Sequence, residues 1–429
     1  MECFTLFPES GSPESTGKPL AHGRPLAQSR WLSIVGIGED GVKGLGENAR
    51  AAIASASVVF GGRRHLELAT PLIAGEARPW PMPFDAAMRD VMTLRGQKVC
   101  VLASGDPFFF GVGATLSRQV PADEFTSYPA PSAFSLAASR LGWPLQEIET
   151  VSLHGRPLDL VRPLLHPGRR IIALTSDEKG PAELAALLCG TGFGASRMTV
   201  LEALGGNAER IRPARAGEFA LQDINTLNVV AIEVAAKADA RILPRGFGLD
   251  DALFEHDGQI TKREIRALTL AALSPRRGEL LWDIGAGSGS IGIEWMLADP
   301  SLRAIAIEAD ARRAARIGRN ASAFGVPGLK IVVGEAPMAL AGLPQPDAIF
   351  IGGGGSEPGV FDAAVEALKP GGRLVANAVT LEMEMVLLAA RERLGGDLTR
   401  VEISRAAPLG AMSGWKPAMP VIRWNWTKP

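Results

Sequence analysis

The chain has 429 residues, of which 46% are hydrophobic, and its formal net charge is −1 at pH 7. This length exceeds one ordinary hydrophobic core, so we expect two or three domains. The nearly neutral charge argues against a nucleic-acid-binding protein that depends on a basic field. No apolar run reaches the roughly 18 residues of a membrane-spanning helix, so we expect no membrane partner.

The cysteines indicate the cellular compartment, and the composition of the first residues indicates whether they are ordered. Cys3, Cys100 and Cys189 are far apart and match no metal-binding spacing. We therefore expect reduced thiols, no bound metal and a cytoplasmic protein. Residues 1–29 are rich in Ser, Pro, Gly and Glu, and they lack the basic start and apolar stretch of a secretory signal. This composition predicts a disordered extension.

Strand and helix patterns alternate through the first half of the chain. In chain order, strands are predicted at 31–35, 58–60, 98–103, 149–153, 170–175, 198–202 and 228–233, and helices at 47–56, 113–118, 132–141 and from about 177. The pattern predicts two small α/β lobes, about 31–140 and 141–238, within a domain at 30–238. Pro244 and Gly246 end the pattern and mark a linker from about 235 to 244.

A glycine-rich turn follows the first strand. Residues 36–41, Gly-Ile-Gly-Glu-Asp-Gly, have the spacing of a dinucleotide fingerprint. The next strand, however, ends at Gly61 and Gly62 before two arginines, with no carboxylate that could hold a ribose. Such a turn without that acid is weak evidence for a nicotinamide cofactor.

The second half, 245–429, alternates strands and helices regularly. Strands are predicted at 280–284, 303–307, 330–333, 347–351 and 373–377, a helix at 291–297, and two further strand-like runs between 401 and 424. This alternation is typical of an open, mainly parallel sheet with helices on both faces.

The most informative motif is Asp283-Ile284-Gly285-Ala286-Gly287-Ser288-Gly289, between the first strand of this half and its helix. Glu308 ends the next strand, where a carboxylate can accept hydrogen bonds from both ribose hydroxyls. A dinucleotide fingerprint would need glycine at position 290, which is Ser290. The spacing therefore favours S-adenosylmethionine (SAM) over a pyrophosphate-containing ligand.

Several segments together resemble two known families. The first half resembles the tetrapyrrole (corrin and porphyrin) methylases, and the second half resembles the decarboxylating precorrin methyltransferases of cobalamin biosynthesis. The matching segments are 35–38, 104–107 and 130–132 in the first half, and 248–254, 258–266, 283–289, 334–337 and 351–355 in the second. The resemblance implies a two-lobed tetrapyrrole-methylase domain followed by a Rossmann-like class I SAM-dependent methyltransferase domain.

The resemblance also implies a reaction. Precorrin-6B would receive methyl groups at ring carbons 5 and 15 from two SAM molecules and lose carbon dioxide from the ring C acetate, giving precorrin-8. The second domain would carry decarboxylation and methylation at carbon 15, and the first would methylate carbon 5. It further implies an acidic tetrapyrrole substrate, two SAM sites per chain, no nucleic-acid partner and a homo-oligomer.

The candidate SAM contacts come from both halves. In the second domain they are Thr261, Asp283, Gly285, Ala286, Gly287, Ser288, Gly289, Glu308, Glu335 and Ala336. In the first domain they are Gly36, Gly38, Gly105, Asp106 and Ser132. Two of these have a structural alternative: Thr261 and Glu264 fit a helix capping box, and Asp106 before proline is a turn signal by itself.

Substrate contacts are expected on the same side of the second domain. Gly352, Gly353 and Gly354, followed by Gly355, would leave room for a large flat substrate. Candidates for chemistry or for binding substrate carboxylates are His256, Lys262, Arg263 and Arg266. An exposed helix face explains the three cations equally well, and a surface or packing role competes for the histidine. No acid stands out as the proton donor for decarboxylation.

Two other functions fit parts of the sequence. The first half could be a tetrapyrrole-binding scaffold without catalysis, although its intact glycine-rich turn and 104–111 loop argue against that. The glycine motif also occurs in RNA methyltransferases, but the chain lacks a basic and aromatic stripe.

Overall fold

The computed structural model describes residues 30–81 and 84–429, and the chain divides into two compact units, Met1–Ser132 and Ala133–Pro429. The predicted extension at 1–29 lies outside the described residues. Among the described residues, no helix is long and apolar enough to cross a membrane.

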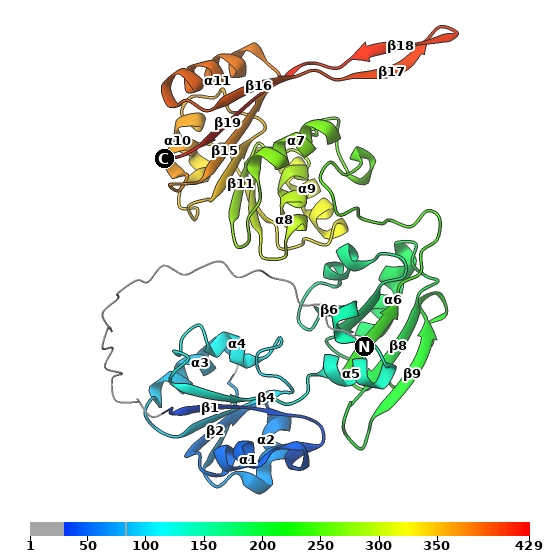
Figure 1. The fold of residues 1–429 in the computed structure, drawn as a ribbon, viewed down its shortest axis with the longest axis vertical. Coiled ribbons are helices and arrows are strands. Elements are labelled where there is room, and N and C mark those ends of the chain that lie inside the picture. Colours follow the sequence, from blue (N-terminus) through cyan, green and yellow to red (C-terminus); the bar gives the residue numbers. More distant parts are fainter. Residues whose placement is uncertain (1–29, 82–83) are drawn as a thin grey trace, which may run out of the picture. The chain divides into compact units, whose positions relative to one another are not determined.

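The first unit is a five-stranded, wholly parallel sheet in the order β3-β2-β4-β1-β5 (Figure 1). Its strands are β1 Leu32–Ile37, β2 Val58–Gly61, β3 Glu76–Pro79, β4 Val99–Ser104 and β5 Phe125–Tyr128, and its helices are α1 Glu47–Ala54, α2 Arg63–Ala69, α3 Phe84–Thr93 and α4 Val112–Leu116. The central strands β1 and β4 are continuous apolar runs because core side chains cover both faces of the sheet.

The second unit begins with a mixed sheet in the order β6-β7-β10-β8-β9, in which only β6 and β7 pair in parallel. Its elements are α5 Ala133–Leu141, β6 Ile148–Ser152, β7 Arg170–Leu174, α6 Gly180–Gly190, β8 Arg197–Glu202, β9 Arg210–Arg215 and β10 Asn228–Glu233. Helix α5 packs here, with Phe134 beside Ile172 and Val229. The first unit therefore ends at Ser132, whereas we expected the first lobe to extend to about residue 140.

The remainder of the second unit is built on a seven-stranded sheet in the order β13-β12-β11-β14-β15-β19-β16. Its strands are β11 Leu280–Ile284, β12 Arg303–Glu308, β13 Lys330–Val333, β14 Ala348–Ile351, β15 Arg373–Ala378, β16 Asp397–Val401 and β19 Val421–Thr427. The first five of these strands in chain order are parallel, and β19 runs antiparallel between β15 and β16.

Helices cover both faces of this sheet, as the sequence pattern predicted. They are α7 Arg263–Leu273, α8 Ser290–Ala298 and α9 Ala311–Ala323 on one face, and α10 Val360–Ala367 and α11 Leu381–Leu394 on the other. The α/β class and the Rossmann-like sheet are confirmed. The strand order reverses between β11 and β14, and this reversal creates the crevice in which such sheets bind ligands.

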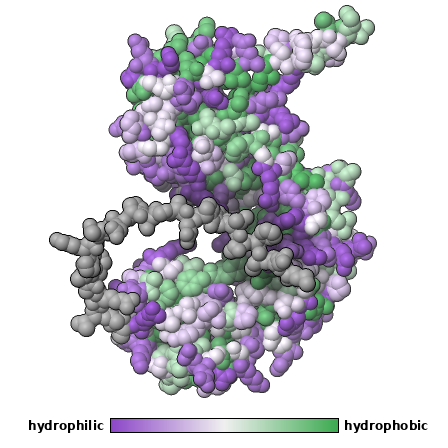
Figure 2. All heavy atoms as spheres, in the orientation of Figure 1, coloured by the Kyte–Doolittle hydropathy of each residue, from purple (hydrophilic) through white to green (hydrophobic). Residues whose placement is uncertain are grey.

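A separate hairpin, β17 Ser404–Leu409 and β18 Met412–Pro417, projects from this domain (Figure 1). Figure 2 colours the end of the hairpin mainly in pale shades, and Leu409, Met412 and Trp415 are exposed there.

Two of the strands that the sequence did not predict share a physical character. Strands β3 and β9 lie at sheet edges and are largely exposed, and each contains a proline, Pro79 and Pro213. Proline is tolerated in edge strands, which need no apolar run. The hydrophobic pattern used for prediction is therefore absent from them.

Arg266 is buried in the core of the C-terminal domain, which corrects both alternatives considered for it. Its guanidinium donates to Glu294 at 2.5 Å and to Asp251 at 3.0 Å, and it also bonds the carbonyl oxygens of Thr261 and Leu249. Burial raises the pKa of the Glu294 carboxyl, and the charge of Arg266 opposes that rise. Arg266 thus fastens α7 to α8 and is neither an exposed residue nor a substrate contact.

Replacing Arg266 with methionine should lower the free energy of unfolding by about 3–5 kcal/mol, because Glu294 would be left buried and without its cation. Arg263→Met, on the same helix but exposed, should change it by no more than about 0.5 kcal/mol. Urea denaturation of the full chain would measure both. Similar stabilities for the two variants would contradict a structural role for Arg266.

Candidate active site

A cavity of about 1000 Å³ lies over the carboxyl ends of the C-terminal sheet. The predicted residues that line it are Thr261, Lys262, Gly285, Ala286, Gly287, Glu308, Glu335, Ala336, Gly352, Gly353 and Gly354. Segments separated by up to about 90 residues in the sequence therefore meet at one place. This size accommodates a nucleoside cofactor together with part of a larger ligand.

The two predicted glycine segments touch at the reversal of strand order. A side chain at Gly285 would place its Cβ 2.5 Å from the carbonyl oxygen of Gly353, and Gly285 has φ +70°. The Gly352 N–H donates to the Ile284 carbonyl at 2.9 Å. Only glycine at position 285 therefore allows the turns after β11 and β14 to pass at backbone distance.

Glu308 connects the glycine turn to the following helix. Its carboxylate accepts the N–H of Gly287 at 2.8 Å and the N–H of Asp310 at 3.0 Å. The side chain lines the cavity although it is only 6% exposed. A carboxylate in this position can receive ribose hydroxyls, which is the geometry that the sequence motif predicts.

Three residues of the glycine motif do not line the cavity. Ser288 and Gly289 are buried, and Gly289 is the N-cap of α8, with φ +76° and no space for a Cβ beside Ile317. Asp283 is fully buried and accepts the N–H of Gly292 at 3.0 Å. These residues stabilise the turn on its buried side, away from the cavity.

The environment of Asp283 changes its acidity. Burial raises the pKa of Asp283 to about 7, and the negative charge of Glu308 contributes to the rise, although the Gly292 N–H opposes it. The buried carboxyl is therefore partly protonated near neutral pH.

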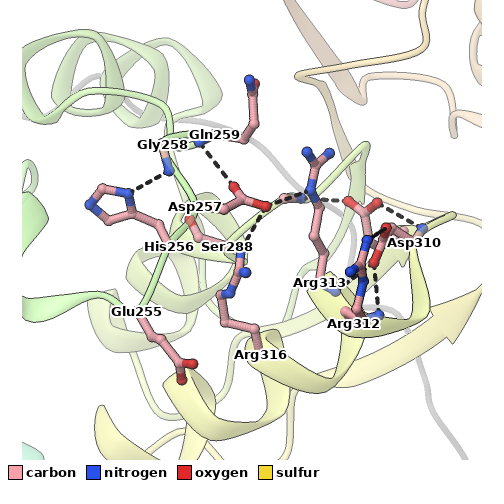
Figure 3. A network of polar contacts seen from close by, with 12 residues as sticks. Glu255, His256, Asp257, Gly258, Gln259, Ser288, Asp310, Arg312, Arg313 and Arg316 are labelled. Carbon is pink, nitrogen blue, oxygen red and sulfur yellow. Dashed lines mark hydrogen bonds and ion pairs between the residues drawn. The ribbon is translucent and has the colours of Figure 1, made fainter.

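Helix α9 holds the loop that covers the glycine turn (Figure 3). Asp257 lies within 3.0 Å of both Arg313 and Arg316, and these cations hold the pKa of Asp257 well below its usual range. Glu255 pairs with Arg319 through two hydrogen bonds of 2.8 and 2.7 Å. These ion pairs fix the residues just before the cavity-lining segment 258–261.

Asn320 links this loop directly to the glycine motif. Its amide oxygen accepts the Glu255 N–H, and its amide nitrogen donates to the carbonyl oxygens of Glu255 and Ser288, each at 2.9 Å. The side chain is 2% exposed. The loop, the glycine turn and α9 are thereby joined by one buried amide group.

Two candidates from the 256–264 segment do not line the cavity, and the structural alternative for Thr261 is not observed. His256 does not line the cavity, and its Nδ1 accepts the Gly258 N–H at 3.0 Å, which stabilises the loop. The capping box is wrong, because α7 begins at Arg263 with Lys262 as an N-cap that makes no side-chain cap bond. Arg263 faces a different, smaller cavity beside Pro244.

Sequence reasoning missed the far wall of the cavity. Asn377, Val379, Ile403, Arg405, Met419 and Val421 line it beside β15 and the root of the hairpin. None belongs to a recognisable local motif. Arg405, for example, pairs with Glu264, which lies 141 residues away in the sequence.

In the first unit, three predicted segments converge in the same manner. A Cβ at Gly36 would lie 1.8 Å from the carbonyl oxygen of Gly105, and a Cβ at Gly105 would lie 3.0 Å from the Cα of Ser132. Gly38 follows on the same turn, and its Cβ would meet Asp40 at 2.8 Å. The end of β1, the loop after β4 and the 130–132 turn thus form one tight junction.

Asp106, beside this junction, accepts the N–H of Phe108 at 2.8 Å, so its carboxylate forms the turn that the sequence alternative described.

Nearby, the Nε2 atom of His65 lies 2.7 Å from the Ser104 hydroxyl at the end of β4. Burial and the charge of Arg64 lower the pKa of His65 to about 4. Sequence reasoning gave this histidine no role, because it lies outside the matching segments.

The two sheets and their glycine junctions define a pair of methyltransferase domains in one chain. Residues 32–220 match the family described as tetrapyrrole (corrin/porphyrin) methylases, and residues 252–428 match the precorrin methyltransferase domain. A Sinorhizobium protein named precorrin-6Y C(5,15)-methyltransferase (decarboxylating) is 66% identical over 400 residues, which cover 93% of this chain and 97% of the relative. The chain belongs to this family.

Shorter relatives correspond to part of the chain. A Salmonella typhimurium protein named cobalt-precorrin-6B C(15)-methyltransferase (decarboxylating) is 38% identical over 38% of this chain and 86% of its own length. The solved C-terminal domain of precorrin-6Y C5,15-methyltransferase from Rhodobacter capsulatus is 51% identical, covers 43% of this chain and 100% of that domain, and has a TM-score of 0.42.

Replacing Gly285 with alanine should weaken SAM binding to the C-terminal domain at least tenfold, because the new Cβ collides with the Gly353 backbone at a positive φ. Gly353→Ala is the matched control, since its Cβ would meet Gly285 atoms only at 3.8 Å and beyond. Calorimetric titration with SAM would compare the two variants. Equal losses would show that backbone approach is not the reason for the glycine.

Asp283→Asn should remove a pH dependence of stability. Because the folded-state pKa of about 7 exceeds the ordinary value of 3.8, the protonated carboxyl favours folding, and this contribution is lost as pH rises from about 4 to 7. The unmodified chain should lose about 1 kcal/mol per pH unit relative to the variant across that window. Denaturation at pH 5, 6 and 7 measures the difference, and parallel curves would contradict the raised pKa.

Proposed function

We propose that this protein methylates a precorrin at ring carbons 5 and 15 and removes carbon dioxide from the ring C acetate in cobalamin biosynthesis. The observation that carries the proposal is the 66% identity to the Sinorhizobium relative across nearly the whole of both chains. The tetrapyrrole-methylase domain and the precorrin methyltransferase domain are thus both present in this chain, the first before the second, and each contains its glycine junction.

The two activities divide between the domains. The C-terminal domain carries methylation at carbon 15 and decarboxylation, which agrees with the name of the Salmonella relative that covers only 38% of this chain. The N-terminal domain methylates carbon 5. The carboxyl ends of its parallel strands present the Gly36, Gly105 and Ser132 junction for this step.

The chain's own residues fit SAM in the C-terminal cavity. Gly285 and Gly287 would pass beside the methionine part, Glu308 would accept the ribose hydroxyls, and Glu335 with Ala336 would flank the adenine. The fit rests on two features: positive-φ glycines whose missing side chains leave space, and a carboxylate fixed at the cavity wall. A second site in the N-terminal domain, at Gly36, Gly38, Gly105, Asp106 and Ser132, would make two per chain.

When bound, SAM supplies the methyl group, and the protein's task is to position the acceptor carbon and exclude water. Residues 352–354 are glycines, so no side chains project into the cavity there and a flat ring can approach the backbone. Asn320 and the ion pairs of α9 hold the 258–261 segment against the glycine turn, so the two ligands meet in a preformed space.

Mass spectrometry after anaerobic incubation with precorrin-6B and methyl-labelled SAM tests the proposal. The unmodified chain should add two labelled methyl groups and remove one carbon dioxide. Gly285→Ala should add at most one label and retain the carboxylate, because only the C-terminal site is damaged. A product with no label would refute the function, and one label from the unmodified chain would leave one domain as a scaffold.

A further inference from the structure

The sheet order separates the C-terminal cavity into two sides. The cofactor side lies over β11, β12 and β13 and includes the glycine turn, Glu308 and Glu335. The other side lies over β14, β15 and β19, and it extends onto the strands that enter and leave the hairpin. A substrate that meets SAM end-on must occupy this second side.

The second side has the character of a surface for a flat amphiphilic ring. Val379 and Met419 line it and are 54% and 70% exposed, and Ile403 and Val421 lie beside them. Apolar side chains of this kind would contact the face of a macrocycle, whereas its carboxylates would have to end near cations at the edge.

Three cations line the described cavity: Lys262, Arg313 and Arg405. Arg313 belongs to the cofactor side and is bound to Asp257 at 3.0 Å. The other two hold their partners weakly or incompletely. The Lys262 ammonium is 3.9 Å from Asp251, and Arg405 gives one nitrogen to Glu264 at 2.5 Å while half of its side chain is exposed.

The hairpin root places a second cation directly opposite Arg405. In the antiparallel register of β17 and β18, Arg405 pairs with Lys416. Like charges at directly opposed positions destabilise a strand pair. Among the described residues, Arg405 pairs with Glu264 whereas Lys416 forms no ion pair, so an anionic ligand at the root would meet a cation that has no carboxylate partner.

We propose that Arg405, with Lys416 opposite it on β18 and Lys262 lining the same cavity, binds peripheral carboxylates of the tetrapyrrole at the edge of the C-terminal cavity. The inference rests on the proposed function and adds the residue that anchors the substrate. The guanidinium fork offers N–H donors beyond the one used by Glu264, so it can bind a carboxylate without losing that ion pair. The hairpin is then the substrate-binding arm of this domain.

The test is the steady-state rate of carbon dioxide release by the full chain at varied precorrin concentration. Arg405→Gln should raise the KM for the macrocycle roughly ten- to a hundredfold, since a charge-assisted hydrogen bond is lost, and should leave the Kd for SAM within about twofold. Arg405→Lys should fall between, because the charge remains and the fork is lost.

Arg400→Gln is the matched control. Arg400 is an arginine on neighbouring β16, 61% exposed and paired with Glu402 at 2.9 Å, and it does not line the cavity. Its KM should stay within about twofold of the unmodified value. An unchanged KM for Arg405→Gln would overturn this proposal alone, as would an equal weakening of SAM and macrocycle binding. No turnover by the unmodified chain would overturn the proposed function and this inference with it.

Discussion

Two loops pass each other at backbone distance where the C-terminal sheet reverses its strand order, and the cavity depends on that approach. Gly285 follows β11 and Gly353 follows β14, and there is no space at Gly285 for a Cβ. This contact fixes the positions of both loops relative to the ends of β11 and β14. Glu308 and the segment 258–261 are then placed around the turn, and the cavity opens beyond it.

The same physical solution occurs in the N-terminal unit on an unrelated sheet. There Gly36, near the end of β1, approaches Gly105, just after β4, again at the carboxyl ends of adjacent parallel strands. In both cases a ligand can reach backbone atoms because no Cβ intervenes. Two different sheets in one chain therefore form the same kind of junction, because each has glycine where two strand ends converge.

The sequence predicted what is encoded locally and missed what depends on distant contacts. The glycine motif and Glu308 were found because strand, turn, helix and acid occur at fixed short spacing. Arg266 was misjudged, because a cation on an amphipathic helix is read as exposed and its buried partner Glu294 lies 28 residues further on. No sequence motif identified Arg405, because its position at the cavity edge depends on the hairpin and on an ion pair with Glu264, which lies 141 residues away in the sequence.

The position of β19 has a consequence for biosynthesis of the protein itself. The last strand of the chain lies between β15 and β16, so β16 has no neighbour in the sheet until residues 421–427 have been made. The hairpin connects β16 to β19, so its root is anchored only when β19 pairs with β16. During synthesis, the part of the cavity over β11, β12 and β13 can form before β19 is made, whereas the part beside β15 and the hairpin root is completed only when β19 pairs with its neighbours.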